Sequence, residues 1–106
     1  EKELSRHNVA GRVVVIDCVT LWCTNFFMEF DSNVASSLEA VKKEVDKFTQ
    51  QDATFIFVTN EIGWGGVSEN KLQRKFTDLQ GWTNQYIASH ADDVYLMASG
   101  IPVKIK

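Results

Sequence analysis

The chain has 106 residues, of which 44% are hydrophobic and 24% are charged. This is the size and composition of one folded globular domain, and it excludes a disordered chain, a collagen-like repeat and a membrane-embedded bundle. The net charge of −3 argues against charge-driven binding to nucleic acid or to a membrane surface. The chain has two cysteines, no signal-peptide pattern and no long apolar run, which together predict a cytoplasmic protein.

Three apolar runs predict three parallel β-strands. They are Val13–Asp17, residues 54–59 and residues 94–98. The first run is continuous and rich in β-branched residues, which is typical of a strand buried on both faces. Each run finishes in small or polar residues at its carboxyl end.

Three stretches with apolar residues at three- and four-residue spacing predict helices. They are residues 21–30, which follow Thr20, residues 34–48 and residues 69–90. Strands that alternate with helices predict an α/β fold with a mostly parallel sheet and helical crossovers. Residues 103–106 alternate apolar with basic side chains, which predicts a short antiparallel edge strand after a turn at residues 100–102.

Ligands of open parallel sheets bind outside the carboxyl ends of the strands, so the residues at these ends should gather on one rim. They are Asp17, Asn60, Glu61 and Ser99. A lone carboxylate after an apolar strand, as at Asp17, has the form of the acidic residue that supports Mg²⁺ in P-loop nucleotide enzymes. The alternative is that Asp17 caps the following helix or faces solvent.

A glycine-rich segment, GWGG at residues 63–66, follows Asn60 and Glu61. Glycine backbones allow close approach to a ligand, and the neighbouring carboxylate could position water or a metal ion. The alternative is a plain turn with Trp64 packed over the sheet. The glycine spacing does not match the dinucleotide-binding fingerprint.

The cysteines and histidines lack the spacing of a metal site. Cys18 and Cys23 have no second pair, and His7 and His90 lie far from them in the sequence. We expect both thiols to be buried, and we expect neither histidine to act as a nucleophile.

Two further groups have a structural and a functional interpretation. Trp22, Phe26 and Phe27 form an apolar cluster, which favours a place in the core or in a subunit contact over a cofactor cage. Lys104 and Lys106 could meet a phosphate, although lysines on an edge strand commonly only prevent aggregation.

Several longer strings resemble one enzyme family, the bifunctional adenosylcobinamide kinase and adenosylcobinamide-phosphate guanylyltransferase of cobalamin synthesis. VVIDCVTLW at residues 14–22, continuing through Thr24-Asn25, resembles its acidic strand motif. VTNEIGWG at residues 58–65 is a second match, and it continues to Val67 and Glu69-Asn70. Further matches, in order along the chain, are FTD at residues 76–78, Gly81, Asn84-Gln85, SGIP at residues 99–102 and Lys104.

The resemblance implies a RecA-like P-loop nucleotide-binding fold and a homotrimer with adenosylcobinamide and nucleotides as substrates. It implies phosphorylation of the aminopropanol hydroxyl of adenosylcobinamide, and transfer of GMP onto the resulting phosphate through a covalent guanylyl-histidine. With Mg²⁺, GTP and ATP as cofactors, Asp17 would contact Mg²⁺ or nucleotide, Thr20 and Asn60 would contact nucleotide, and Glu61 would take a catalytic place near the transferred phosphate.

The sequence departs from the family pattern at its beginning. It contains no Gly-x-x-x-x-Gly-Lys-Ser/Thr run, and the family's GMP-accepting histidine also belongs upstream, so neither His7 nor His90 inherits its role. Residues 1–106 are therefore expected to be the carboxyl-terminal part of a single nucleotide-binding transferase domain, inactive alone because phosphoryl transfer depends on positioning. Without the central Walker A strand, we expect unpaired strand edges and uncovered apolar faces, unless another segment fills the gap, the remaining strands close up or they associate with another chain.

Two other functions stay open. One is a noncatalytic α/β binding or assembly module that keeps the scaffold without the chemistry. The other is a different RecA-like ATPase, which would differ mainly in its substrate.

Overall fold

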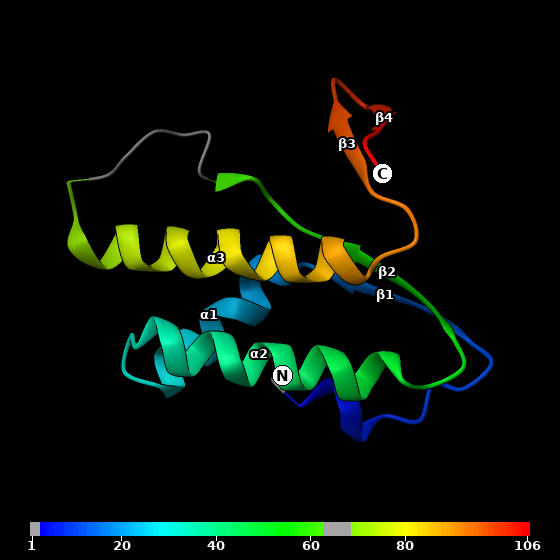
Figure 1. Ribbon diagram of the computed structural model, residues 1–106, viewed down its shortest axis with the longest axis horizontal. Helices are drawn as coiled ribbons and strands as arrows, with labels where there is room; N and C mark the ends of the chain where they lie inside the picture. The colour runs from blue at the N-terminus through cyan, green and yellow to red at the C-terminus, as the bar shows by residue number, and fades with distance from the viewer. Residues whose placement is uncertain (1–2, 63–68) are drawn as a thin grey trace.

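The computed structural model describes residues 3–62 and 69–106. In chain order the elements are η1 (Leu4–Arg6), β1 (Val13–Asp17), α1 (Val19–Glu29), α2 (Val34–Thr49), β2 (Thr54–Val58), α3 (Lys71–His90), β3 (Tyr95–Ala98) and β4 (Ile101–Lys104) (Figure 1). The helices predicted from apolar spacing are confirmed, with ends that differ by at most two residues.

The first two predicted strands form a parallel pair. Val13 lies opposite Thr54 and Asp17 lies opposite Val58, with the register unbroken between them. The connection between the two strands runs through α1 and α2, which is the helical crossover that the alternation of elements predicts.

The helices cover one face of this pair. Val14 and Ile16 of β1 and Phe55 and Phe57 of β2 pack against buried residues of all three helices. Those buried helix residues are Val19, Cys23, Phe27, Phe48 and Leu79. The edge-on ring contact between Phe48 and Phe55, with centroids 5.0 Å apart, joins α2 to the sheet.

A second buried cluster joins α1 to α2. Trp22 and Phe26 of α1 pack with Val41 and Val45 of α2, and the rings of Trp22 and Phe26 meet edge to face. With Phe27 also buried, the prediction that the three aromatic residues belong to a packed core is confirmed.

The other face of the parallel pair is uncovered by any described element. Val13 and Val15 are 67% and 57% exposed, and Ile56 and Val58 are 46% and 42% exposed. Burial of the first strand on both faces, which its continuous apolar run predicts, is therefore wrong for the described residues. The expected uncovered apolar face is present.

The third predicted strand does not join this sheet. β3 pairs antiparallel with β4, Tyr95 opposite Lys104 and Ala98 opposite Ile101, as a separate hairpin beside the end of α3 (Figure 1). Its turn is Ser99-Gly100, where both φ angles are positive, so Ile101 and Pro102 belong to the strand rather than to the predicted turn. A turn with two positive φ angles suits a two-residue hairpin, and so short a loop costs little chain entropy to close.

None of the helices in the described part of the chain has the length and apolarity that crossing a bilayer requires. The described fold is therefore a mixed α/β arrangement of one small parallel sheet, one antiparallel pair and three packed helices.

Candidate functional site

The candidate site lies at the carboxyl ends of β1 and β2. Because Asp17 is the register partner of Val58, it lies beside the point where the chain leaves β2 and continues into Asn60 and Glu61. The prediction that these three residues share one edge of the sheet is confirmed. The prediction for Ser99 is wrong, because Ser99 turns the separate hairpin.

Asp17 is exposed, and no hydrogen bond or ion pair joins it to another described residue. It does not cap α1, because the residue at the start of that helix is Cys18 and no side chain caps it. Of the two alternative roles considered for Asp17, helix capping is therefore wrong. Its carboxylate oxygens are available to a ligand.

Thr20 and Asn60 contact each other. The side-chain amide of Asn60 donates to Thr20 Oγ1 at 3.1 Å. Thr20 belongs to the first turn of α1, directly after β1, whereas Asn60 follows β2. This hydrogen bond therefore connects the two strand ends. It agrees with the expectation that Thr20 and Asn60 lie close enough to contact one nucleotide.

Helix α3 supplies site residues that the sequence did not reveal as such. Asn84 donates to the main-chain oxygen of Asn60 at 3.0 Å and to Glu61 Oε1 at 3.2 Å. Gln80 donates to Thr59 Oγ1 at 2.7 Å and to Asn84 Oδ1 at 2.9 Å. The spacing of four places Gln80 and Asn84 on one helix face, but such a polar pair is by itself more typical of a solvated face.

The described residues of the site could bind a magnesium ion through one carboxylate, that of Asp17, with waters and substrate phosphates as the other ligands. The described residues include no group of three or more His, Cys, Asp or Glu that could hold a metal ion. Mg²⁺ commonly keeps several waters and binds one or two carboxylates together with substrate phosphates. The single exposed carboxylate of Asp17 suits that arrangement and does not suit a cage built from protein ligands alone.

Asp17 also lies at one end of a groove of about 420 Å³ along β1. Besides β1, the groove is lined by Leu4, His7 and Val9, which precede β1, and by Leu21 and Trp22 of α1. Its walls are mainly apolar, so it places a carboxylate at the end of an apolar surface.

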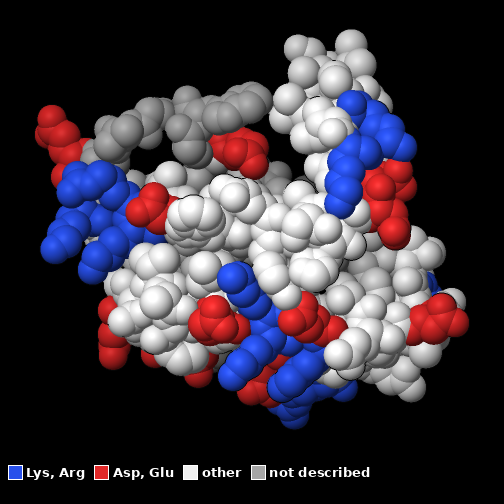
Figure 2. Space-filling model, viewed as in Figure 1, with Lys and Arg blue, Asp and Glu red and all other residues white. Residues whose placement is uncertain are grey.

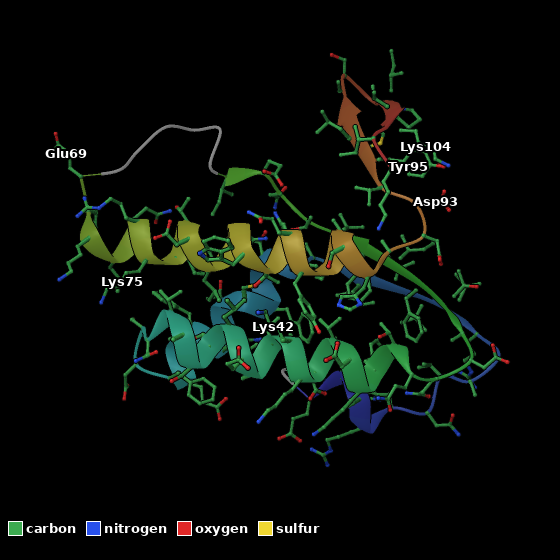
Figure 3. The ribbon with its side chains drawn as sticks, viewed as in Figure 1. Lys42, Glu69, Lys75, Asp93, Tyr95 and Lys104 are labelled. Carbon is green, nitrogen blue, oxygen red and sulfur yellow. The ribbon has the colours of Figure 1, made fainter. Side chains whose placement is uncertain are left out.

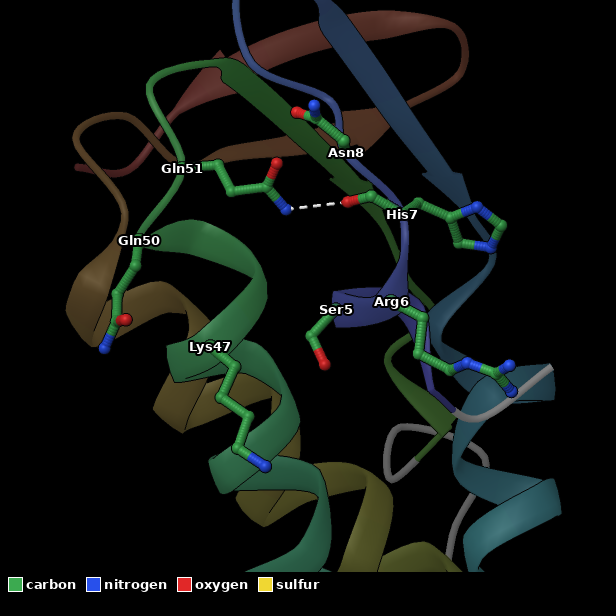
Figure 4. A pocket seen from close by; sticks show the side chains of 7 residues that line it. All are labelled: Ser5, Arg6, His7, Asn8, Lys47, Gln50 and Gln51. Carbon is green, nitrogen blue, oxygen red and sulfur yellow. Dashed lines mark hydrogen bonds between the residues drawn. The ribbon is translucent and has the colours of Figure 1, made fainter.

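A second pocket of similar volume lies between η1 and the end of α2 (Figure 4). Gln51 closes its rim: it donates to the main-chain oxygen of His7 and accepts from the main-chain nitrogen of Val9, each at 2.8 Å. These residues precede β1 and β2 in the chain, so the pocket lies at the amino ends of the strands, away from Asp17.

The two cysteines have different surroundings. Cys23 is fully buried, and burial raises the pKa of its thiol to about 11, although the neighbouring Thr83 hydroxyl opposes the rise. Cys18 is only half-buried, so the prediction that both thiols are buried is wrong for Cys18. Cys18 is less covered because it starts α1 at the edge of the sheet.

Neither histidine lies at the carboxyl ends of the strands. His90 ends α3, and its ring lies 4.5 Å from that of Tyr86. The Tyr86 hydroxyl donates to Asp46 at 2.5 Å, and this hydrogen bond raises the pKa of Tyr86 to about 12. His7 precedes β1 and lines both the second pocket and the groove along β1 that includes Asp17.

The two lysines near the end of the chain have protein partners. Lys104 lies 2.7 Å from Asp93, with its ammonium 5.9 Å from the centre of the Tyr95 ring (Figure 3). The hydrogen bond to Asp93 raises the pKa of Lys104. Lys106 donates to the main-chain oxygens of Ala88 and Ser89. The Lys106 contacts hold the end of the chain against the end of α3. The contacts of both lysines favour the structural interpretation.

The surface around α3 is mixed in charge. Figure 2 shows Lys and Arg gathered near the start of α3, whose sequence includes Lys71, Arg74 and Lys75, and interspersed with Asp and Glu elsewhere on this face. The glycine-rich segment 63–66, including Trp64, lies outside the described residues, so neither of its two interpretations is tested.

The parallel pair with its helical crossover defines this chain as an α/β protein, with carboxylate and amide groups at the carboxyl ends of neighbouring strands. More narrowly, the chain belongs to the cobinamide kinase / cobinamide phosphate guanyltransferase family, whose sequence model matches residues 1–105. The family resemblance predicted from the strings at residues 14–22 and 58–65 is confirmed.

Named relatives are similar to a large part of the chain. It is 34% identical over 107 residues to the bifunctional adenosylcobalamin biosynthesis protein CobU of Escherichia coli, a match that covers 91% of this chain and 59% of that protein. It is 35% identical over 104 residues to the protein of the same name from Salmonella typhimurium, covering 88% and 58%.

A third relative is the bifunctional adenosylcobalamin biosynthesis protein CobP of Pseudomonas aeruginosa, 33% identical over 98 residues, with 92% of this chain and 55% of that protein covered. The chain thus spans between 55% and 59% of the length of these three relatives, and it matches their carboxyl-terminal part.

Proposed function

We propose that residues 1–106 are the carboxyl-terminal part of a nucleotide-binding transferase domain that acts in cobalamin biosynthesis as an adenosylcobinamide kinase and adenosylcobinamide-phosphate guanylyltransferase. Family membership over residues 1–105 and the names of the three relatives support this proposal. In the complete polypeptide, a RecA-like P-loop fold would include an upstream Walker A loop and the upstream histidine that accepts GMP.

The proposal comprises two reactions. In the first, the hydroxyl of adenosylcobinamide attacks the γ-phosphorus of ATP or GTP, and the nucleoside diphosphate leaves. In the second, a histidine nitrogen attacks the α-phosphorus of GTP and releases pyrophosphate. An oxygen of adenosylcobinamide phosphate then displaces the histidine, which yields adenosylcobinamide-GDP.

The described residues have defined places in this chemistry. The Asp17 carboxylate would hold Mg²⁺ together with waters and phosphate oxygens, and Mg²⁺ when bound neutralises phosphate charge. Thr20 and Asn60, already joined at 3.1 Å, would contact the nucleotide. Glu61 would lie near the transferred phosphate, held by its hydrogen bond from Asn84.

One observation carries the proposal. The register that sets Asp17 opposite Val58 brings the end of β1 and the segment after β2 to the same edge of the sheet. Phosphoryl and nucleotidyl transfer depend mainly on positioned charges and hydrogen-bond donors. The carboxyl ends of β1 and β2 place two such charges side by side: Asp17, which has no partner among the described residues, and Glu61, which is held by Asn84.

The test uses the complete protein with GTP labelled in the α-phosphate, and Mg²⁺. We expect a covalent GMP adduct that is stable to denaturant and labile in acid. An absence of this adduct, in protein whose upstream sequence includes the Walker A loop and the histidine, would contradict the guanylyltransferase assignment.

The same proposal includes a homotrimer in the cytoplasm. The trimer is supported by the family resemblance alone, and light scattering of the complete protein tests it.

A further inference from the structure

We propose that Asn84, anchored by Gln80, is a positioning residue that fixes the segment of residues 59–61 at the carboxyl end of β2. The inference rests on the proposed function, because it concerns where Asn60 and Glu61 lie relative to a bound nucleotide. Asn84-Gln85 is one of the strings that resemble the family, but neither that match nor the family membership gives Asn84 a role in the site.

A single side chain contacts three consecutive residues of this segment. The Asn84 amide nitrogen donates to the main-chain oxygen of Asn60 at 3.0 Å and to Glu61 Oε1 at 3.2 Å. Its carbonyl oxygen accepts from the Thr59 hydroxyl at 2.6 Å. Asn84 therefore restrains the backbone at residue 60 and the side chains on either side of it.

Gln80 makes the anchor rigid. Its side chain has no exposed surface, and its amide nitrogen donates to both Thr59 Oγ1 and Asn84 Oδ1. Leu79 and Thr83, its neighbours on α3, are also fully buried. Rotation of the Asn84 or Thr59 side chain would take away one of the two acceptors of the buried Gln80 amide nitrogen, which is unfavourable. The Gln80 amide oxygen is buried without a partner among the described residues, so these two hydrogen bonds are the ones that fix the side chain.

The chemistry of the amide explains the choice of residue. Two N–H groups satisfy two oxygens while one oxygen satisfies two donors, so Asn84 uses its whole hydrogen-bonding capacity. An aspartate has nearly the same shape but supplies no donors, and its charge would oppose that of Glu61. Replacement of Asn84 by Asp therefore turns its two hydrogen bonds to Asn60 and Glu61 into repulsive contacts between oxygens, without creating a cavity.

The segment held by Asn84 is also connected to α1. The Asn60 amide donates to Thr20 Oγ1, and Thr20 lies three residues after Asp17 in the sequence. A displacement of residues 59–61 would therefore change the positions of Asn60 and Glu61 relative to Asp17. Shifts of about 1 Å near reacting groups can lower a rate about a hundredfold.

The experiment compares wild-type complete protein with Asn84→Asp under saturating GTP and Mg²⁺. The rate constant of GMP-adduct formation and the final adduct per chain are measured separately, together with the melting temperature. We expect the rate constant to fall by about 10- to 100-fold, with the final adduct per chain unchanged. Gln73→Glu, the same change of charge at an exposed position on α3, should leave the rate constant within about twofold of wild type.

Two outcomes would overturn the inference. One is a wild-type rate constant in Asn84→Asp; the other is a loss of adduct per chain with the rate constant of the remaining sites unchanged, which would show only a structural role. A wild-type protein that forms no adduct would refute the proposed function itself, and this inference would fall with it.

Thr59 provides a milder variant, because its side chain is exposed and Gln80 keeps its hydrogen bond to Asn84 when the Thr59 hydroxyl is removed. Thr59→Val removes the hydroxyl that joins Gln80 to Asn84 and should lower the rate constant several-fold. Thr59→Ser keeps the hydroxyl and should restore it. Equal rate constants in the two variants would count against the positioning role even if Asn84→Asp did not fold.

Discussion

Two carboxylates at neighbouring strand ends have different surroundings. Glu61 accepts a hydrogen bond from Asn84, whereas Asp17 has no partner among the described residues. A carboxylate held by an amide keeps one orientation, and an unengaged one can bind a hard cation. These two residues therefore suit different parts of the proposed chemistry.

Replacement of Asp17 by Asn in the complete protein should lower the rate of GMP-adduct formation at least tenfold, because the available cation ligand loses its charge. Radiolabel incorporation from GTP at several Mg²⁺ concentrations measures this. Asp17 is exposed, so the melting temperature should change little. Asp92→Asn, also at an exposed position, is the control and should retain wild-type incorporation.

The raised pKa of Cys23 has a consequence for stability. The native state keeps the thiol neutral up to a pKa of about 11, whereas an unperturbed thiol ionises from about 9. Above pH 9 the unfolded chain therefore binds fewer protons, and the free energy of unfolding should fall as the pH rises toward 11.

Urea unfolding between pH 8 and about pH 10.5 measures this dependence. Cys23→Ala should be less stable at every pH because it leaves a cavity, but its stability should decline less steeply above pH 9. Parallel declines in the two proteins would show that Cys23 does not cause the effect.

Among the elements, α2 shows how local chemistry and packing agree. Asn33 is the N-cap of the helix, and its side chain accepts from the main-chain nitrogen of Ser36 at 2.9 Å. Val41, Val45 and Phe48 then fall on one face and are buried. The apolar spacing alone predicted this helix to within one residue of its end. The Asn33 cap was not predicted and is seen in the structure.

Replacement of Asn33 by Ala should lower the free energy of unfolding by about 1 kcal/mol, the usual cost of losing an N-cap hydrogen bond. Asn33→Asp retains an acceptor for the Ser36 amide and should cost much less. Chemical denaturation of the three proteins measures the difference. Equal losses in both variants would indicate that the cap hydrogen bond is not the cause.

At the scale of the whole molecule, the main feature is a sheet covered on one face only. Val13, Val15, Ile56 and Val58 expose apolar surface on the other face, and exposed apolar patches favour association. β1 and β2 each pair with one strand in the described chain, so each also has an unpaired edge.

The 106-residue chain by itself should therefore self-associate as its concentration rises. Val15→Lys places a charge in the middle of the exposed face and should shift the chain toward monomer without loss of folding, since Val15 is 57% exposed. Gln50→Lys, at an exposed position beyond α2, should not do so. Light scattering over a concentration series measures the mass; a chain that stays monomeric throughout would contradict this prediction.

The spacing of apolar residues over a few neighbouring positions distinguishes strands from helices, so the sequence by itself determined the three helices, β1 and β2. It also determined that Asp17 and Asn60-Glu61 share an edge, because two parallel strands must end on the same side. The family resemblance likewise depended on contiguous strings.

The tertiary structure alone decided the partner of β3, the exposed face of β1 and the contribution of α3 to the site. A strand sequence does not specify which edge it pairs with, and local hairpin closure at Ser99-Gly100 brought β4 to β3. Gln80 and Asn84 reach residues 21 to 25 positions away, and a contact over that separation depends on how α3 packs against the sheet.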